Sequence, residues 1–316
     1  MFAETEYILS KFQVRKNSTQ KALFCSWLFD VLKEHCYEVK IESGGSLVKS
    51  NNVVVGDPET ATVVYTAHYD TCAVLPFPNL IFPQNLLLYL LYQILIAVPM
   101  FVLAIGAEVL LLFLWDGTPM WLAMLVVYLV LAFCIWWMLA GPANQHTMND
   151  NTSGVAALME IALSLPEADR RTTAFVFFDN EEKGLLGSSF FKKMHGSKMK
   201  NTLVINFDCV SDGDYIHFYP NKALKKNEPI LNRLENSFLS NGKKQTEVVK
   251  GFCFYPSDQK AFVNGVGVAA MHKGRLGYWL GRIHTKRDTV FEIENIELLR
   301  TGALNLVSSL SKDQRT

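Results

Sequence analysis

The sequence predicts an α/β fold with a central mixed, largely parallel sheet flanked by helices, into which a two-helix transmembrane hairpin is inserted. Strand-like segments alternate with amphipathic helical segments on both sides of a hydrophobic insert. The insert itself consists of two long apolar runs separated by a turn. We therefore expect one α/β domain built from residues 1–80 and 143–316, interrupted by a hairpin at 81–142.

The composition excludes several classes of protein. The chain of 316 residues is 50% apolar and has 30 basic and 30 acidic residues. This balance argues against nucleic-acid binding, which needs a basic face, and gives no support for a polybasic membrane contact. The six scattered cysteines form no CxxC pair and favour reduced thiols in a cytosolic domain. Residues 1–15 are mixed polar, so we expect no cleavable signal.

The first part of the domain begins with a predicted helix. Residues 18–36 carry apolar side chains at helical spacing, and strand-like segments follow at 38–43, 53–56 and 62–67. Gly56-Asp57-Pro58 marks a turn after the second of these strands. The third strand leads directly into His68.

The hydrophobic insert has the length and composition of two membrane spans. Residues 86–115 contain one charge, Glu108, and one proline, while residues 120–140 contain no charge. A bilayer crossing takes about 20 apolar residues. Tryptophans near the span ends suit an interfacial aromatic belt, namely Trp115, Trp121, Trp136 and Trp137. We expect a membrane hairpin, because two buried core helices of this apolarity are too much for a domain of this size.

Two questions about the spans stay open at the sequence level. Glu108 lies at the far interface if the span uses the first part of its run, and is buried and protonated if the span is shifted toward Trp115. No Lys or Arg occurs between Lys49 and Arg170, so the positive-inside rule gives no orientation. We expect an integral membrane protein with a cytoplasmic α/β domain, given the unpaired cysteines and the missing signal.

After the insert, strands and helices alternate again. We expect helices at 154–165, 182–195, 229–239 and 292–310, and strands at 174–178, 203–207, 215–219 and 267–271. Residues 222–227 and 241–247 are rich in lysine and asparagine, which favours surface loops.

The strand at 174–178 ends in Asp179-Asn180-Glu181-Glu182. Sites in open α/β sheets lie at the carboxyl ends of strands. Adjacent side chains in extended geometry point in different directions, so one carboxylate of the pair could hold a cation while the other moves a proton. The alternative is a solvated acidic turn that caps the next helix.

Other acids and histidines also follow strand-like runs. Taken singly, Asp150 could be an N-cap, and His68 or His284 a structural histidine. Together they supply imidazoles and carboxylates, the ligand types that suit zinc and related divalent ions. The full set is His68, Asp70, Asp150, Glu181, Glu182, Asp208 and His284.

The motifs around these residues resemble those of a known family. In chain order they are His68-Tyr69-Asp70, Asn149-Asp150-Asn151-Thr152-Ser153-Gly154, Asn180-Glu181-Glu182-Lys183-Gly184, Asp208, and Ile283-His284-Thr285 with Asp288-Thr289. They resemble the co-catalytic di-zinc exopeptidases, a group that includes bacterial aminopeptidases, glutamate carboxypeptidase and glutaminyl cyclase. The resemblance covers everything except the hairpin, and five motifs in one order make it specific.

The resemblance implies two Zn²⁺ ions per chain, with Asp150 bridging them. His68 and Asp208 would complete one position, and Glu182 and His284 the other. Glu181 would be the general base that takes a proton from the attacking water and passes it to the leaving amine.

Two further residues take catalytic roles by resemblance. Asp70 would accept the other imidazole N–H of His68 and so orient it. Tyr255, in Tyr255-Pro256-Ser257-Asp258, resembles a late-loop tyrosine that donates to the oxyanion, although Phe254 occupies the expected place. A plain loop aromatic is the alternative for Tyr255. Asp179, His146 and His272 have no assigned role.

The leading hypothesis is a membrane-embedded zinc aminopeptidase that hydrolyses N-terminal peptide bonds. The second hypothesis is a glutaminyl cyclase, which uses a similar ligand set but a single zinc and no attacking water. An inactive membrane receptor or scaffold is a third, although the expected ligands and base are all present. Because the hairpin is inserted between two ligand motifs, we expect short, apolar or membrane-derived peptide substrates that reach the site along the lipid bilayer.

Overall fold

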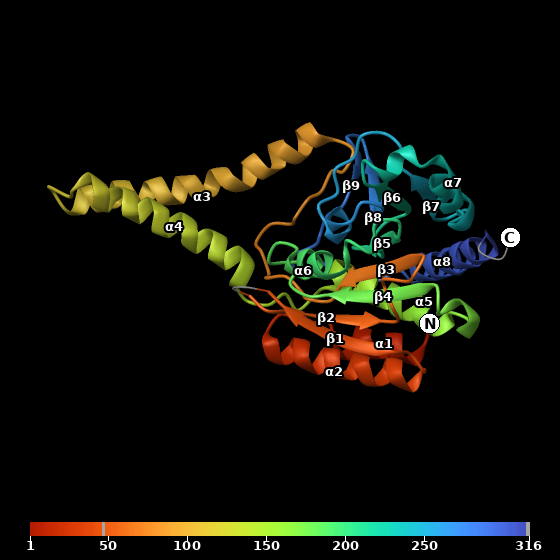
Figure 1. Ribbon diagram of the computed structural model, residues 1–316. Coiled ribbons are helices and arrows are strands. Elements are labelled where there is room, and N and C mark those ends of the chain that lie inside the picture. Colours follow the sequence, from red (N-terminus) through yellow and green to blue (C-terminus); the bar gives the residue numbers. More distant parts are fainter. Residues whose placement is uncertain (46–47, 314–316) are drawn as a thin grey trace.

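The computed structural model describes residues 1–45 and 48–313. Its described strands form one nine-stranded sheet in the order β1-β2-β4-β3-β5-β8-β6-β7, with β9 paired to β8 (Figure 1). Strands β3, β4, β5 and β8 pair in parallel, and β1, β2 and β6 add antiparallel neighbours. The strands are β1 (Val39–Gly44), β2 (Ser50–Val55), β3 (Val63–His68), β4 (Thr173–Phe178), β5 (Leu203–Phe207), β6 (Tyr215–Pro220), β7 (Gln245–Val248), β8 (Gly265–Gly274) and β9 (Gly277–Trp279). The predicted fold class is confirmed.

Helices cover both faces of this sheet. Those of the α/β domain are α1 (Ala3–Lys11), α2 (Ser18–Glu34), α5 (Gly154–Ser164), α6 (Leu186–His195), α7 (Glu228–Ser237) and α8 (Ile293–Asp313). All except α6 contribute to the large hydrophobic core on one face, whereas Phe191 of α6 packs against the other. Helix α2 begins with a capping box between Asn17 and Gln20.

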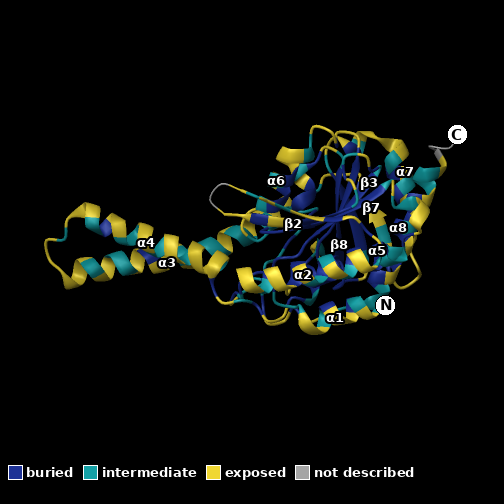
Figure 2. Cartoon of the chain, turned by 60° about the horizontal axis from the view of Figure 1, so that its bottom comes forward, coloured by how far each residue is buried: buried dark blue, intermediate teal, exposed yellow. Residues whose placement is uncertain are grey.

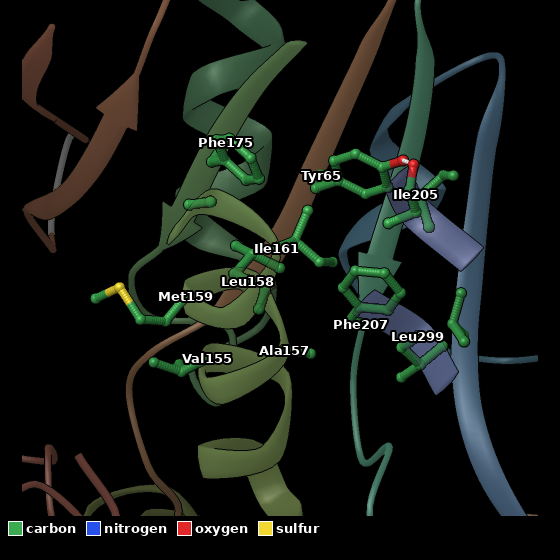
Figure 3. Packing of buried hydrophobic residues seen from close by; sticks show 14 of the residues in the cluster. Tyr65, Val155, Ala157, Leu158, Met159, Ile161, Phe175, Ile205, Phe207 and Leu299 are labelled. Atoms are coloured by element: carbon green, nitrogen blue, oxygen red, sulfur yellow. Dashed lines mark hydrogen bonds between the residues drawn. The ribbon is translucent and has the colours of Figure 1, made fainter. Parts of the chain in front are cut away.

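The helices on both faces explain why the central strands are buried at every residue. Tyr65 of β3 stacks between Phe175 of β4 and Phe207 of β5, and Leu158 and Ile161 of α5 lie against this face (Figure 3). The alternate side chains of the same strands, such as Val64 and Val176, point to the α6 face. Burial on both faces is the normal state of a parallel sheet covered by helices.

Two long helices, α3 (Leu86–Leu114) and α4 (Met120–Ala140), project together from the domain (Figures 1 and 2). Both are long and apolar enough to cross a membrane, and only 6% of the most apolar window of each is buried. Their buried residues are the small Ala104 and Ala123. These helices are therefore not core helices of the α/β domain.

The hairpin is fastened to the domain at its base. Tyr89 of α3 packs on Phe254, and the hydroxyl of Tyr92 donates to the carbonyl of Pro78. At the other end, Lys16 Nζ donates to the carbonyl of Leu139, 2.8 Å away, in the last turn of α4. The segments that enter and leave the hairpin are joined by a β-bridge between Ala73 and Ala143.

Two local predictions were wrong. Helix α6 begins at Leu186 rather than at 182, because Gly184 and Leu185 have positive φ angles of 98° and 59° and close a turn instead. The predicted surface loop at 241–247 contains most of β7, which pairs in parallel with β6. This edge strand is polar, with only Val248 buried, so it lacks the apolar pattern of a strand.

Candidate metal centre

The structure gathers the predicted ligands at one edge of the sheet. His68 is the last residue of β3, Asp208 follows β5, and Glu181 and Glu182 follow β4. Asp150 lies in the irregular turn 148–153 that leads into α5, where the Asp150–Asn151 peptide bond is cis. Parallel strands end at the same edge, so residues far apart in sequence meet there.

The first cluster consists of His68, Asp150 and Asp208. His68 Nε2 lies 3.4 Å from Asp150 Oδ1 and 3.6 Å from Asp208 Oδ1. All three side chains are buried, and one donor atom from each lies within 4.8 Å of the others. These distances suit ligands arranged around one divalent ion.

The second cluster shares Asp150 and adds Glu182 and His284. His284 Nε2 lies 3.1 Å from Asp150 Oδ2 and 3.4 Å from Glu182 Oε2. Asp150 thus presents one carboxylate oxygen to each cluster, as a bridging ligand would. Cys72, which the sequence reasoning did not single out, also lies within 4.8 Å of these donors.

Glu181 and Asp70 adjoin the clusters. A carboxylate oxygen of Glu181 lies within 4.8 Å of donor atoms of His68 and Glu182. Asp70 Oδ1 is 3.6 Å from His68 Nδ1, which is nearer, at 3.1 Å, to the main-chain carbonyl of Asp70. The Asp70 carboxylate instead accepts the main-chain N–H groups of Glu181, at 2.9 Å, and Glu182, at 3.2 Å. Asp70 therefore fixes the turn that carries both glutamates.

Tyr255 does not point a free hydroxyl toward a substrate in this conformation. Its buried hydroxyl donates to the main-chain carbonyl of Asp208 at 3.0 Å, and its ring stacks on Tyr219. This contact supports the main chain at a predicted ligand. The oxyanion role stays a prediction that requires this hydrogen bond to be exchanged.

Two positioning residues were missed by sequence reasoning. Asp288 accepts the main-chain N–H of Asn149 at 2.7 Å and of Asp150 at 3.0 Å. Asn151 donates to the carbonyl of Phe207 at 3.0 Å and accepts from Cys209 N, at 3.2 Å. Both residues stand inside motifs that carried the resemblance, so the signal was present, but their partners are visible only in the fold.

Asp179, which had no predicted role, links β4 to its neighbours through its carboxylate. Its Oδ1 lies 2.6 Å from Lys21 Nζ of α2, and its Oδ2 accepts the main-chain N–H of Asn51 at 3.0 Å. His272 pairs with Asp212 at 3.1 Å, outside the two clusters.

The electrostatics of the site are those of a cation-binding centre. Burial raises the pKa of Glu181 and of Glu182 well above the ordinary glutamate value, and Asp150 adds to the effect at Glu182. Burial by itself lowers the pKa of His68, but the negative charge of Glu181 and hydrogen bonds to Asp150 and Asp208 raise it well above its usual value. Packing this much negative charge together is unfavourable unless cations balance it.

One atom supports the fit of the donor set to a metal. Glu182 Oε1 is buried and has no hydrogen-bond partner among the described residues, although a carboxylate oxygen out of water normally has one. Imidazole and carboxylate donors are those that zinc takes in catalytic sites. The residues present therefore fit the two positions that the resemblance implied.

A sequence model of Peptidase family M28 matches residues 127–308, more than half of the chain. The chain belongs to peptidase family M28. The match contains Asp150, Glu181, Glu182, Asp208 and His284, while His68 and Asp70 precede it. The resemblance to the di-zinc exopeptidases is confirmed.

Solved structures with the same fold include members of two enzyme classes. A Zn-dependent exopeptidase from Parabacteroides distasonis shares 16% identity with this M28 chain, covering 97% of it and 96% of the other chain, at a TM-score of 0.57. A glutaminyl cyclase from Porphyromonas gingivalis shares 14% identity, with coverages of 97% and 96% and a TM-score of 0.57. An aminopeptidase from Legionella pneumophila shares 14% identity, with coverages of 97% and 67% and a TM-score of 0.55. No curated protein matches the chain.

Proposed function

We propose that this M28 family member is a membrane-embedded zinc aminopeptidase. The observation that carries the proposal is the pair of donor clusters joined by Asp150, with Glu181 beside them. Family membership supports a zinc-dependent peptidase, and solved structures of this fold include an aminopeptidase and a Zn-dependent exopeptidase.

The residues divide the chemistry among them. His68 and Asp208 would hold one ion, Glu182 and His284 the other, and Asp150 both. When bound, zinc supplies Lewis-acid chemistry that polarises a peptide carbonyl and makes water more acidic. Glu181, held by Asp70 through its main-chain N–H, takes the proton of the attacking water and gives it to the leaving amine.

A groove beside His284 suits an apolar substrate side chain. It has a volume of about 540 Å³, and its lining includes Leu75, Leu80 and Trp279. Thr285, which follows His284, also lines it, and Leu75 N donates to the carbonyl of His284 at 2.7 Å. We expect Trp279→Ala to raise KM for peptides with apolar termini and to leave KM for Ala-initiated peptides much less changed.

The hairpin supports a membrane location. Its large apolar side chains are exposed along both helices, a surface that water disfavours at about 25 cal/mol per Å² and that a bilayer would cover. For a cytoplasmic domain, support comes from the unpaired cysteines and from Lys16, whose ammonium group lies at the hairpin base. A cysteine introduced at one of residues 116–118, between the two helices, tests the orientation when intact cells are labelled with a thiol reagent that does not cross the membrane. The introduced cysteine should react from outside, whereas Cys36 in the α/β domain should not.

Two substitutions test the assigned roles. Glu181→Gln should lower kcat by at least about a thousandfold while the bound zinc stays at the wild-type level, because it removes the base and keeps the shape. Glu182→Ala should lose zinc, because it removes a ligand. Metal analysis of detergent-purified protein, with turnover of aminoacyl substrates, checks both. Near-normal turnover in Glu181→Gln contradicts the proposed mechanism.

Glutaminyl cyclisation is the second candidate, since the same fold serves glutaminyl cyclases. Mass spectrometry of a Gln-initiated peptide separates the two reactions. Cyclisation loses ammonia and leaves one product peptide, whereas hydrolysis adds water and yields two products. We expect hydrolysis, because both donor clusters are complete.

A further inference from the structure

The second donor cluster contains a thiol that neither the family match nor the motifs assign. Cys72 is buried, and its Sγ lies within 4.8 Å of donor atoms of Asp150, Glu182 and His284. The first cluster, by contrast, groups only imidazole and carboxylate donors, from His68, Asp150 and Asp208. The two metal positions are therefore chemically different.

A second observation in this cluster points to a cation, and another fixes the direction of the thiol. Glu182 Oε1, in the same cluster, is buried with no hydrogen-bond partner in the part of the chain that the structure describes, and the Glu182 side chain is only 10% exposed. Asn144 Nδ2 lies 3.8 Å from Cys72 Sγ and also donates to the carbonyls of His146, at 2.5 Å, and Thr285, at 3.0 Å. This contact helps to fix the direction of the sulfur, as outer hydrogen bonds do for metal ligands.

Main-chain contacts fix the position of Cys72. It follows the His68-Tyr69-Asp70 turn, and its carbonyl accepts the main-chain N–H of Asn144 at 3.2 Å. The next residue, Ala73, forms a β-bridge with Ala143. The thiol is thus held where the chain segments that lead into and out of the hairpin pair with each other.

We propose that Cys72 is a metal ligand that, with Asp150, Glu182 and His284, makes this position the softer and tighter of the two. The inference rests on the proposed zinc centre and specifies one of its positions. On coordination the S–H bond breaks, the proton passes to solvent, and a sulfur–metal bond forms. A thiolate strengthens binding of soft divalent ions such as zinc and cadmium, whereas the position with His68 and Asp208 has harder donors.

Cobalt(II) titration of the full-length, detergent-solubilised, chelator-stripped protein tests the proposal. Tetrahedral cobalt absorbs in the visible, and a cobalt–thiolate bond adds a charge-transfer band in the near ultraviolet. We expect this second band in the wild type, rising with the first equivalent of cobalt only. Cys72→Ser should abolish the band and weaken that equivalent by at least about tenfold, while visible bands still report bound cobalt.

Cys209→Ser is the matched control, since Cys209 Sγ is 3.1 Å from Asp208 Oδ1 and adjoins the other cluster. It should retain the ultraviolet band. Three outcomes would overturn the role of Cys72 without contradicting the metal centre. The wild type could bind cobalt without the ultraviolet band, the band could survive in Cys72→Ser, or it could disappear in Cys209→Ser. If the wild type binds no cobalt, both the metal centre and this inference fail.

Discussion

At the scale of single residues, the site depends on acids that hold other residues in place. Asp70 positions the turn of Glu181 and Glu182, and Asp288 positions Asp150. Burial raises the pKa of Asp288 to about 7, and the nearby Asp150 contributes. These carboxylates bind main-chain N–H groups, so their effect passes through the backbone to the ligands.

Asp288→Asn should weaken metal binding by roughly 10- to 100-fold, because an amide cannot accept both N–H groups that the carboxylate accepts. Isothermal titration of stripped protein with zinc measures the change. Lys286→Asn, an exposed position on the same loop, is the control and should bind zinc like the wild type. Unchanged affinity in Asp288→Asn would show that Asp150 is positioned without it.

A second residue-scale prediction concerns the buried pair of Lys21 and Asp179. Lys21→Met should lower the free energy of unfolding by about 3–5 kcal/mol, since it leaves a buried carboxylate without its cation. The double variant with Asp179→Asn should recover part of this loss. Denaturant unfolding measures both, and a double variant less stable than Lys21→Met would contradict the explanation.

At the scale of elements, the ends of three parallel strands carry the candidate site residues, and the strands supply the rigid support. β3, β4 and β5 are buried on both faces, and His68, the two glutamates and Asp208 lie at or just after their ends. The strands on the other side of the sheet are less uniform. β6 buries a histidine, His217, and burial lowers its pKa to about 4.

His217 makes stability depend on pH. Its folded pKa of about 4 lies below its ordinary 6.5, so the unfolded chain binds the proton more readily. Stability is therefore full above pH 6.5 and falls as the pH drops toward 4, by roughly 3 kcal/mol from this group. Glu247 lies 3.6 Å from Nε2, but its carboxylate is 51% exposed and water screens it.

We expect His217→Asn to flatten the decrease in stability between pH 6.5 and 4.5, as followed by denaturant unfolding at each pH. His195→Asn is the control, because Glu42 and Glu59 raise the pKa of His195 against the effect of burial. Its variant should keep the wild-type decrease in this range. An equal decrease in His217→Asn and the wild type would assign the acid sensitivity to other groups.

At the scale of the whole molecule, the hairpin and the site share their supporting segments. The chain leaves the ligand turn at Cys72 for α3, and returns from α4 a few residues before Asp150. Leu75 N donates to the carbonyl of His284, and Val74 N to that of Pro142. The base of the hairpin therefore contacts segments that carry predicted metal ligands.

Replacing residues 95–136 by a flexible Gly/Ser linker should abolish membrane association and leave zinc content near the wild-type level, because Tyr89 and Tyr92 keep their contacts with the domain. Turnover of apolar, membrane-derived peptides should fall, while that of a soluble aminoacyl substrate should change little. Sedimentation with vesicles and parallel assays measure these effects. Full activity of the shortened protein on apolar peptides would contradict delivery of substrate along the bilayer.

Much of the fold and the site could be predicted locally. The hairpin can be predicted because a long, almost uncharged apolar run is typical of membrane spans. The central strands can be predicted because runs of mostly apolar residues end in polar or acidic ones. β7 and the start of α6 were mispredicted, since an edge strand needs no apolar pattern and a left-handed Leu185 has no sequence signal.

The sequence by itself determined the fold class, the hairpin and the metal-binding residue types, because periodicity, apolar length and motif order are local properties of the chain. Only the tertiary structure decided which candidate donors lie close together, that Asp288 holds Asp150, that Asp179 pairs with Lys21 and that Cys72 lies beside the second cluster. These are distances between segments that are far apart in the sequence, and they exist only once the strands end at a common edge.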